Sequence, residues 1–391
     1  MALPPLPPTF VAGFHDEATV RAMPYRPLGR DGRLVSLLSF GASSLSGSFR
    51  ADTTEAESRA VVVEAVRAGI NVIDTAAWYG HGESERILGR ALKDVPRAAY
   101  YIHTKCGRYL PGVLEQFDFT YDRTVRSVEE SLARLQLDYL DAVQVHDPEF
   151  APSLDVVLTE VLPALAALQA AGKVRRIGVT GYPLAALRYL VDNCPPGVVI
   201  DTALSYCRYN LHDTSLLESG TLAHLRARGV GTICGSPLSM GLLTARGPPA
   251  WHPASAALKA RCAAAAAFCA ARGADIAHLA LHFALFSSAE VATVLVGTAS
   301  LERLRHDVAV AKGAHPLSAA DAETLTEVRA RFFGDAAAAA DAHWEGREVA
   351  DYWIKVGKLD RTAWTAARAR FPEKIAPAEA EHSHVLKKAQ E

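Results

Sequence analysis

A chain of 391 residues that is 50% apolar and 21% charged can bury a large core, and its length permits one large domain or several smaller ones. The formal net charge of -2 leaves no basic surplus for neutralising nucleic-acid phosphates or an anionic membrane surface. No apolar run approaches the ~20 residues that span a bilayer, and the first residues lack a secretory or transit pattern. We therefore expect a cytoplasmic protein that binds neither nucleic acid nor membrane.

The first elements in chain order are an arm and a hairpin. Residues 1–23 are rich in proline and lack an apolar period, which predicts a flexible arm. Two short apolar segments between Tyr25 and Leu38 then flank Asp31-Gly32, a dipeptide that favours a hairpin turn. From residue 38 onward, short β-branched runs alternate with longer helical patterns. Strands are expected at 38–41, 71–74, 100–105, 139–145, 175–180, 199–205, 231–236 and 291–296, and helices at 54–68, 120–135, 158–171, 184–193, 216–228 and 301–311.

Eight strands joined by crossovers, with a helix after the last, predict a closed (β/α)8 TIM barrel over residues 24–340. A doubly wound open sheet is the alternative, but it normally carries a G-x-G-x-x-G turn that this chain lacks. The crossover at 237–290 is long and includes an Ala-rich helix at 258–272, so we expect it to cover a ligand. Residues 341–391 leave the alternating pattern and are expected to be an extension that packs on the barrel or on another protein.

Polar residues end three consecutive predicted strands. Asp74 follows the second barrel strand, Lys105 ends the third and His146 ends the fourth, while Tyr79 lies five residues beyond Asp74. The carboxyl ends of barrel strands meet on the one face where ligands bind, so these four side chains should converge. Four such positions on adjacent strands are unlikely to arise from unrelated polar residues.

The four residue types form a coherent proton-transfer set. A tyrosine with a pKa near ~10 is poorly suited to acid/base work at neutral pH. A Lys ammonium ~4 Å away could lower that pKa by as much as ~3 units before desolvation opposes it. Asp74 would keep Lys105 charged and oriented, and a neutral His146 would orient a substrate oxygen beside Tyr79. We therefore expect Tyr79 to move a proton at an alcohol or carbonyl while a hydride moves elsewhere.

Three motifs in this order resemble the aldo-keto reductase family: Asp-Thr-Ala-x-x-Tyr-Gly at 74–80, Thr-Lys-Cys-Gly at 104–107 and Val-His-Asp at 145–147. Residues 24–345 are similar to its branch of plant-type L-galactose dehydrogenases, most specifically in Gly-Pro-Pro-Ala-Trp-His-Pro-Ala-Ser at 247–255. The resemblance implies a nicotinamide cofactor bound without a Rossmann fold. It also implies oxidation of an aldose, L-galactose in that branch, at C1 to the lactone in ascorbate biosynthesis.

The resemblance also places the cofactor. Its carboxamide would lie near Thr180 and Tyr206. The expected diphosphate contacts are Ser236, Pro237, Leu238, Met240, Gly241 and Leu242, and the expected adenosine contacts are Gly297, Thr298 and Arg303. Three features depart from the family. Thr180-Gly181 and Tyr206 stand where the family usually has Ser-Asn and Gln as carboxamide contacts. Gly235 stands where many members have an aromatic residue, and no basic side chain occurs at 297–302 to bind the 2′-phosphate of NADP. We therefore expect NAD rather than NADP, although Arg303 and Arg305 lie within reach.

Other functions stay open at this stage. Some barrels of this family resemble auxiliary subunits of larger assemblies, such as potassium-channel beta subunits, and the aromatic tail could bind a protein partner. Tyr352, Trp353 and Trp364 are among the aromatic residues of that tail. Within enzymes, an L-fucose or D-arabinose dehydrogenase or a general carbonyl reductase is also possible. No metal site is expected, because His382-Ser-His384 is a weak pattern in a polar tail.

Overall fold

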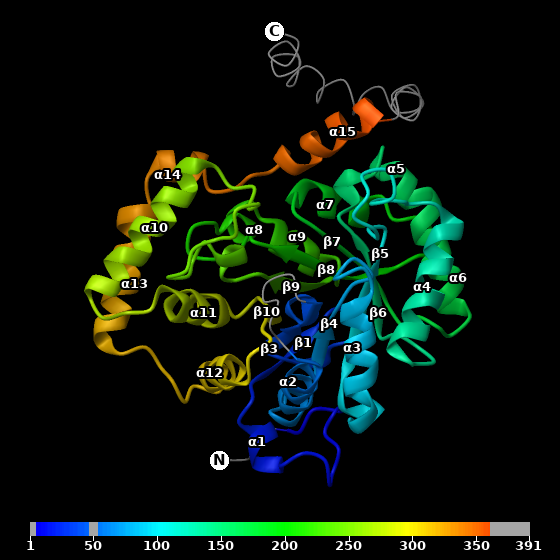
Figure 1. Cartoon of the computed structure of the whole chain (residues 1–391). Coiled ribbons are helices and arrows are strands. Elements are labelled where there is room, and N and C mark those ends of the chain that lie inside the picture. Colours follow the sequence, from blue (N-terminus) through cyan, green and yellow to red (C-terminus); the bar gives the residue numbers. More distant parts are fainter. Residues whose placement is uncertain (1–4, 47–53, 360–391) are drawn as a thin grey trace.

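The computed structural model describes residues 5–46 and 54–359. Eight parallel strands close into a barrel in the order β10-β3-β4-β5-β6-β7-β8-β9, and helices surround it (Figure 1). The strands are β3 (Leu38–Gly41), β4 (Val72–Asp74), β5 (Tyr101–Cys106), β6 (Ala142–His146), β7 (Ile177–Gly181), β8 (Ile200–Tyr206), β9 (Gly231–Gly235) and β10 (Thr293–Gly297). Each overlaps a predicted strand, so the predicted TIM barrel is confirmed.

Helices follow the strands as the barrel fold requires. They are α2 (Glu55–Arg67), α3 (Glu83–Ala91), α4 (Tyr121–Leu135), α5 (Leu154–Val156), α6 (Leu162–Ala170), α7 (Leu184–Asp192), α8 (Ser215–Glu218), α9 (Thr221–Ala227), α10 (Ala256–Ala271), α11 (Ile276–Phe286), α12 (Leu301–Ala311), α13 (Ala319–Phe333), α14 (Ala336–Ala340) and α15 (Arg347–Leu359). The single helix expected at 216–228 is two, because Gly220 between α8 and α9 has a left-handed φ of 73°. The long crossover after β9 carries α11 as well as the expected Ala-rich helix α10.

The N-terminal segment differs from the flexible arm expected at 1–23. From residue 5 onward it packs on the amino-terminal end of the barrel and includes α1 (Glu17–Arg21), with Val20 and Met23 buried. Asn71 Nδ2, on the turn before β4, donates to Thr9 Oγ1 at 3.0 Å. A few apolar side chains and specific hydrogen bonds, rather than a periodic pattern, hold this segment in place.

The predicted hairpin follows, with β1 (Tyr25–Leu28) antiparallel to β2 (Arg33–Ser36). Leu28 and Val35 from this hairpin are buried with Leu204 and Ile233. Leu204 and Ile233 belong to β8 and β9, so the hairpin closes the amino-terminal end of the barrel interior. The opposite, carboxyl end of the strands is therefore the end of the barrel that can bind ligands.

The C-terminal extension lies over that opposite end. Trp344 is buried, and its ring stacks on Tyr182 with centroids 4.8 Å apart. The helix α15 then runs over the barrel (Figure 1), with the Tyr352 ring against Phe117 and Phe150 at centroid distances of 5.0 and 5.6 Å. The described part of the extension thus packs on the barrel. Trp364, His382 and His384 lie outside the described residues.

Within the described residues, no single helix is long and apolar enough to span a membrane. Of the described helices, only α10 and α11 taken together have the length and apolar composition of a membrane span, and they are bent by 103° with respect to each other. Both helices pack within the fold, since α10 contacts α13 and α11 contacts α12 and β10.

Candidate active site

The four predicted proton-transfer residues meet at the carboxyl end of the barrel. Lys105 Nζ donates to Asp74 Oδ1, to the Thr75 carbonyl oxygen at 2.8 Å and to Tyr79 Oη at 3.3 Å. The ring of His146 stands at 90° to that of Tyr79, with centroids 5.9 Å apart. Asp74 and His146 are the last residues of β4 and β6, so strand ends position them as the sequence predicts.

Burial controls the charges of this set. Asp74 and Lys105 are 1% and 2% exposed, so each needs the other as a counter-ion. Burial acts to lower the pKa of Lys105, but Asp74 and Tyr79 together raise it above the ordinary lysine value. Burial raises the pKa of Asp74, and its bonds from Lys105 and Gln144 act in the opposite direction. The carboxylate therefore keeps Lys105 protonated.

The pKa of Tyr79 departs from the sequence-based expectation. Burial raises the pKa of this phenol above its ordinary value, and the nearby Lys105 ammonium offsets only part of that effect. We expected the ammonium to lower the pKa overall, and desolvation reverses the direction. In the protein without ligands, Tyr79 is thus a protonated phenol at neutral pH.

His146 is neutral, as expected. Burial lowers its pKa to about 3, although Asp147 acts to raise it. Asp147 is itself held by Arg108, whose Nη1 donates to Asp147 Oδ2 at 2.7 Å. The Arg108 guanidinium also lies 4.3 Å from the centre of the Trp78 ring. A cation, a carboxylate and an aromatic face therefore surround the opening above Tyr79.

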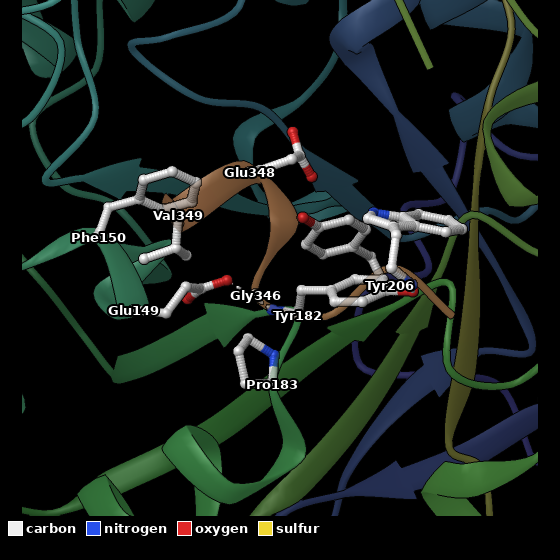
Figure 2. A pocket seen from close by; sticks show the side chains of 9 residues that line it. Glu149, Phe150, Tyr182, Pro183, Tyr206, Gly346, Glu348 and Val349 are labelled. Atoms are coloured by element: carbon white, nitrogen blue, oxygen red, sulfur yellow. Dashed lines mark hydrogen bonds between the residues drawn. The ribbon is translucent and has the colours of Figure 1, made fainter. Parts of the chain in front are cut away.

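A second group of polar side chains, missed by the sequence analysis, lines a small void at this end of the barrel (Figure 2). Glu149 follows β6 and Glu348 belongs to α15, and both border a void of about 10 Å³ together with Tyr182 and Tyr206. Glu149 Oε1 accepts a hydrogen bond from the Tyr182 amide at 2.9 Å, while its Oε2 has no partner among the described residues. Burial raises the pKa of Glu149 well above its ordinary value and also raises that of Glu348. Because Glu348 comes from the extension, no motif in the barrel could indicate it.

A larger cavity of about 390 Å³ lies at the ends of β9 and β10. Six of the predicted cofactor contacts border it: Ser236, Pro237, Leu238, Met240, Gly241 and Gly297. Ser236 and Met240 have left-handed φ values of 58° and 49°, which bend the chain sharply around the cavity. Ser43 and Arg246 border it as well, and the sequence analysis missed both because they lie on loops without a motif. The cavity has the size of a ligand site and fits an elongated polar cofactor.

The other predicted cofactor contacts lie elsewhere. Thr180 is buried at the end of β7, Leu242 is buried behind the turn, and the Thr298 hydroxyl accepts a hydrogen bond from the Ser300 amide at 3.2 Å. Tyr206 borders the small void of Figure 2 rather than the large cavity. Arg303 borders another small void, which shares Leu238 with the large cavity. Five of the six predicted diphosphate contacts and one predicted adenosine contact, Gly297, thus share one cavity, whereas the predicted carboxamide contacts Thr180 and Tyr206 do not border it.

The structure also bears on the departures from the family. A side chain at Gly235 would begin 3.2 Å from Leu204 Cδ2, which would have to shift slightly, and 3.4 Å from Tyr206 Cβ, an ordinary contact distance. Arg305 Nε donates to Glu64 Oε1 at 3.1 Å and is therefore engaged away from the cavity. In the described ranges, no group of three or more His, Cys, Asp or Glu side chains is placed to hold a metal ion.

Comparisons with known proteins identify the family. Residues 37–330 match the sequence profile of the Aldo/keto reductase family. The chain is 47% identical over 307 residues to L-galactose dehydrogenase from Arabidopsis thaliana, covering 78% of this chain and 93% of that protein. It is 33% identical over 280 residues to D-arabinose 1-dehydrogenase from Saccharomyces cerevisiae, covering 69% and 81%.

Solved structures give the same result. A holo form of an aldo-keto reductase from Bacillus halodurans superposes with a TM-score of 0.61 at 26% identity, covering 78% of this chain and 96% of that one. The barrel thus agrees with the sequence comparisons. This chain belongs to the aldo/keto reductase family and is an NAD(P)-dependent oxidoreductase.

Proposed function

We propose that this protein oxidises an aldose, in the first place L-galactose, at C1 to the lactone with NAD as the hydride acceptor. The proposal rests on the hydrogen bonds that Lys105 donates to Asp74 and Tyr79, with His146 beside them, in a chain 47% identical to an L-galactose dehydrogenase. A phenol, an ammonium and a neutral imidazole at one opening suit proton transfer at a sugar hydroxyl. Ascorbate biosynthesis is the pathway that this reaction would serve.

Oxidation at C1 removes a hydride from the carbon and a proton from its hydroxyl group. The C1–H bond breaks, and its electron pair leaves with hydrogen as a hydride for the nicotinamide, which supplies the oxidising power. The C1 hydroxyl gives its proton to the Tyr79 phenolate, and a carbonyl forms at C1. His146 would donate a hydrogen bond to the same oxygen and orient it. Because burial raises the pKa of Tyr79, the phenolate is scarce at neutral pH, so oxidation should accelerate as the pH rises.

The surroundings of the opening support a polyhydroxylated substrate. Asp147, Glu149 and Glu348 offer carboxyl groups that can accept or share hydrogen bonds with sugar hydroxyls, and Arg108 offers donors. Trp78 supplies an aromatic face. Such a set suits a sugar better than an apolar carbonyl compound. D-arabinose stays a second substrate to test, because a relative named for it is 33% identical.

The cavity between β9 and β10 would hold the diphosphate of the cofactor. Backbone groups of the Ser236–Gly241 turn and the Arg246 guanidinium are the groups present there that suit an anion. Thr180 and Tyr206 would contact the carboxamide, and Tyr206, paired with Gly235 in the sheet, has the ring that residue 235 lacks. NAD is proposed over NADP because Arg305 is engaged with Glu64 and residues 297–302 are without a basic side chain.

The cysteines support the expected location. All six are free thiols in the structure, and five of them are buried. Unpaired thiols are typical of a reducing compartment. We therefore propose that the protein acts in the cytoplasm.

Initial rates over a panel of aldoses, each with NAD and with NADP, test the proposal. The panel should contain L-galactose, L-fucose, D-arabinose and D-glucose, with lactone identified by mass spectrometry after each incubation. We expect the highest kcat/KM for L-galactose with NAD. Failure of every aldose, with turnover of simple aldehydes and NADPH instead, would contradict the proposal and favour a general carbonyl reductase.

A further inference from the structure

Gln144 lies inside the barrel directly below the catalytic opening. It occupies β6 two residues before His146, so both side chains point to the interior face of that strand. Its side chain is fully buried, and its Nε2 donates to Asp74 Oδ2 at 2.7 Å. Lys105 binds the other carboxylate oxygen, Oδ1. Asp74 is thus held by a cation on one side and by a neutral amide on the other.

The orientation of this amide follows from its partner. Only the NH2 end can face a carboxylate, so the Gln144 carbonyl oxygen must point away from Asp74. That oxygen, Oε1, has no hydrogen-bond partner in the described part of the chain, and neither has the hydroxyl of Thr202 on β8. Buried polar atoms rarely stay unpaired, and no direct hydrogen bond joins these two, so a bridging water is expected between them.

Gly178 on β7, the strand between β6 and β8, provides the space for this contact. A Cβ atom built at Gly178 would stand 2.9 Å from Gln144 Cγ and 2.5 Å from Thr202 Oγ1. Both distances are too short for a real side chain. The two polar side chains therefore converge over a position that only glycine leaves open.

We propose that Gln144 is a positioning residue, which acts through Asp74 and Lys105 to control the proton affinity of Tyr79. Its amide favours the ionised form of Asp74, and the ionised carboxylate holds Lys105 as an ammonium directed at the phenol. The ammonium in turn stabilises the phenolate that accepts the substrate proton. Thr202 holds the amide in place. This inference rests on the proposed roles of Tyr79 and Lys105.

Other charged and titratable groups surround the set and stay unchanged in the test. They are His103 on β5, His146 and Asp147 at the end of β6, Arg108 after β5, and Arg33 and Arg176, which act on His103. Among the described residues, Lys105 and Gln144 are the side chains that donate hydrogen bonds to Asp74. Loss of the Gln144 amide therefore removes half of the hydrogen bonding that supports the ionised carboxylate.

The principal experiment is the pH profile of kcat/KM for aldose oxidation by Gln144→Met in the full-length protein. Methionine keeps the length and volume of the side chain but has no donor. Because the lost hydrogen bond is made to a charged group, activity at pH 7 should fall by about tenfold or more. The rising limb of the profile should move up by about one pH unit, and wild-type and variant rates should converge at high pH. The melting temperature should change little.

Two further variants separate this role from packing. Gln144→Glu places a second carboxyl group against Asp74, so its activity relative to wild type should fall as the pH rises, the opposite trend to Gln144→Met. Thr202→Val keeps the shape of Thr202 without the hydroxyl and should give a smaller shift in the direction of Gln144→Met. Thr202→Val also keeps the inference testable if the variants at residue 144 fold poorly.

The outcomes are distinct. An equal loss at every pH in Gln144→Met and Gln144→Glu would show that Gln144 only fills space, and the inference would be wrong. An unchanged profile in all three variants would have the same meaning. Near-normal activity of Tyr79→Phe would instead remove the proposed function on which the inference depends, so the two failures can be told apart.

Discussion

The two halves of the site are built by different means. On the side of β4 to β6, side chains bind one another directly, and Lys105 alone contacts Asp74, Thr75 and Tyr79. On the side of β9 and β10, the chain turns sharply at Ser236 and Met240 around a cavity of about 390 Å³. The first half depends on the identity of a few buried groups. The second depends on the path of the backbone.

This difference predicts how each half responds to substitution. A buried ion pair that loses one partner leaves an uncompensated charge, so changes in the first half should be severe. Backbone groups persist when a side chain is replaced, so single changes around the cavity should have modest effects on cofactor binding. The following variants test this asymmetry, from the largest expected effect to the smallest.

Tyr79→Phe should have the largest effect. It removes the phenolic oxygen that exchanges the proton and keeps the ring packing against His146. Turnover should fall at least ~100-fold, the scale of lost general acid/base catalysis. Cofactor affinity, measured by fluorescence titration, should be unchanged. Turnover close to that of wild type would contradict the assignment of Tyr79.

Lys105→Met should reduce both activity and stability. Without the ammonium the pKa of Tyr79 rises further, so the rising limb of the oxidation profile should move to higher pH, with a loss at pH 7 of about tenfold or more. Asp74 loses its counter-ion, so its pKa in the folded protein also rises. Stability lost in this way grows as the pH rises through that pKa, so the drop in melting temperature should be larger at pH 8 than at pH 5.

The control for this variant is Lys93→Met, which removes a lysine from the surface. A pH profile like that of wild type, with only a higher KM for the sugar, would show that Lys105 contacts the substrate instead. Equal destabilisation at pH 5 and pH 8 would show that the pKa of Asp74 stays below this range, and that Asp74 therefore stays charged, when Lys105 is absent.

The two halves also differ in how far the sequence reveals them. Asp74 and His146 end their strands and Lys105 is the second-last residue of β5, so locating the strands places them together without further knowledge. Gln144 escaped notice because a single polar residue within an apolar strand carries no motif. The direction of the Tyr79 pKa was wrong because it depends on the balance of burial against one ammonium, and no spacing rule gives burial.

Contacts between distant segments were the other limit. Ser43 and Arg246 reach the cavity from loops that follow different strands. Glu348 reaches the opening from the extension, about 200 residues beyond Glu149 in sequence. The N-terminal segment resembled a loose arm because its few buried side chains follow no period. Local pattern thus predicted the barrel well, while long-range packing decided the lining of its open end.

Truncation after Glu345 tests whether the extension belongs to the site. It removes Glu348 and Tyr352, which covers Phe117 and Phe150. We expect the melting temperature to fall by a few degrees and the KM for the sugar to rise about tenfold, roughly the loss of one good hydrogen bond to a charged group. Truncation after Leu359 is the matched control and should leave both values unchanged. If the shorter protein melts and reacts like the full chain, α15 instead serves another partner.

Cofactor choice should show the smallest effects, and Asp307 makes it testable by pH. This carboxyl group lies one turn after Arg303 on α12, borders the same void, and burial raises its pKa to about 7. Above that pH it is a carboxylate, which would repel the 2′-phosphate of NADP but not the ribose hydroxyl of NAD. The ratio of kcat/KM for NAD to that for NADP should therefore exceed one and rise several-fold between pH 6 and pH 8. Asp307→Asn should remove this trend with NAD kinetics unchanged.

Arg246→Ala should weaken the binding of NAD and NADP alike, by less than about tenfold, if Arg246 contacts the diphosphate that both cofactors share. A wild-type preference for NADP of tenfold or more at pH 7 would show that Arg303 or Arg246 binds the 2′-phosphate, and that a side chain, not the backbone turn, governs this half of the site.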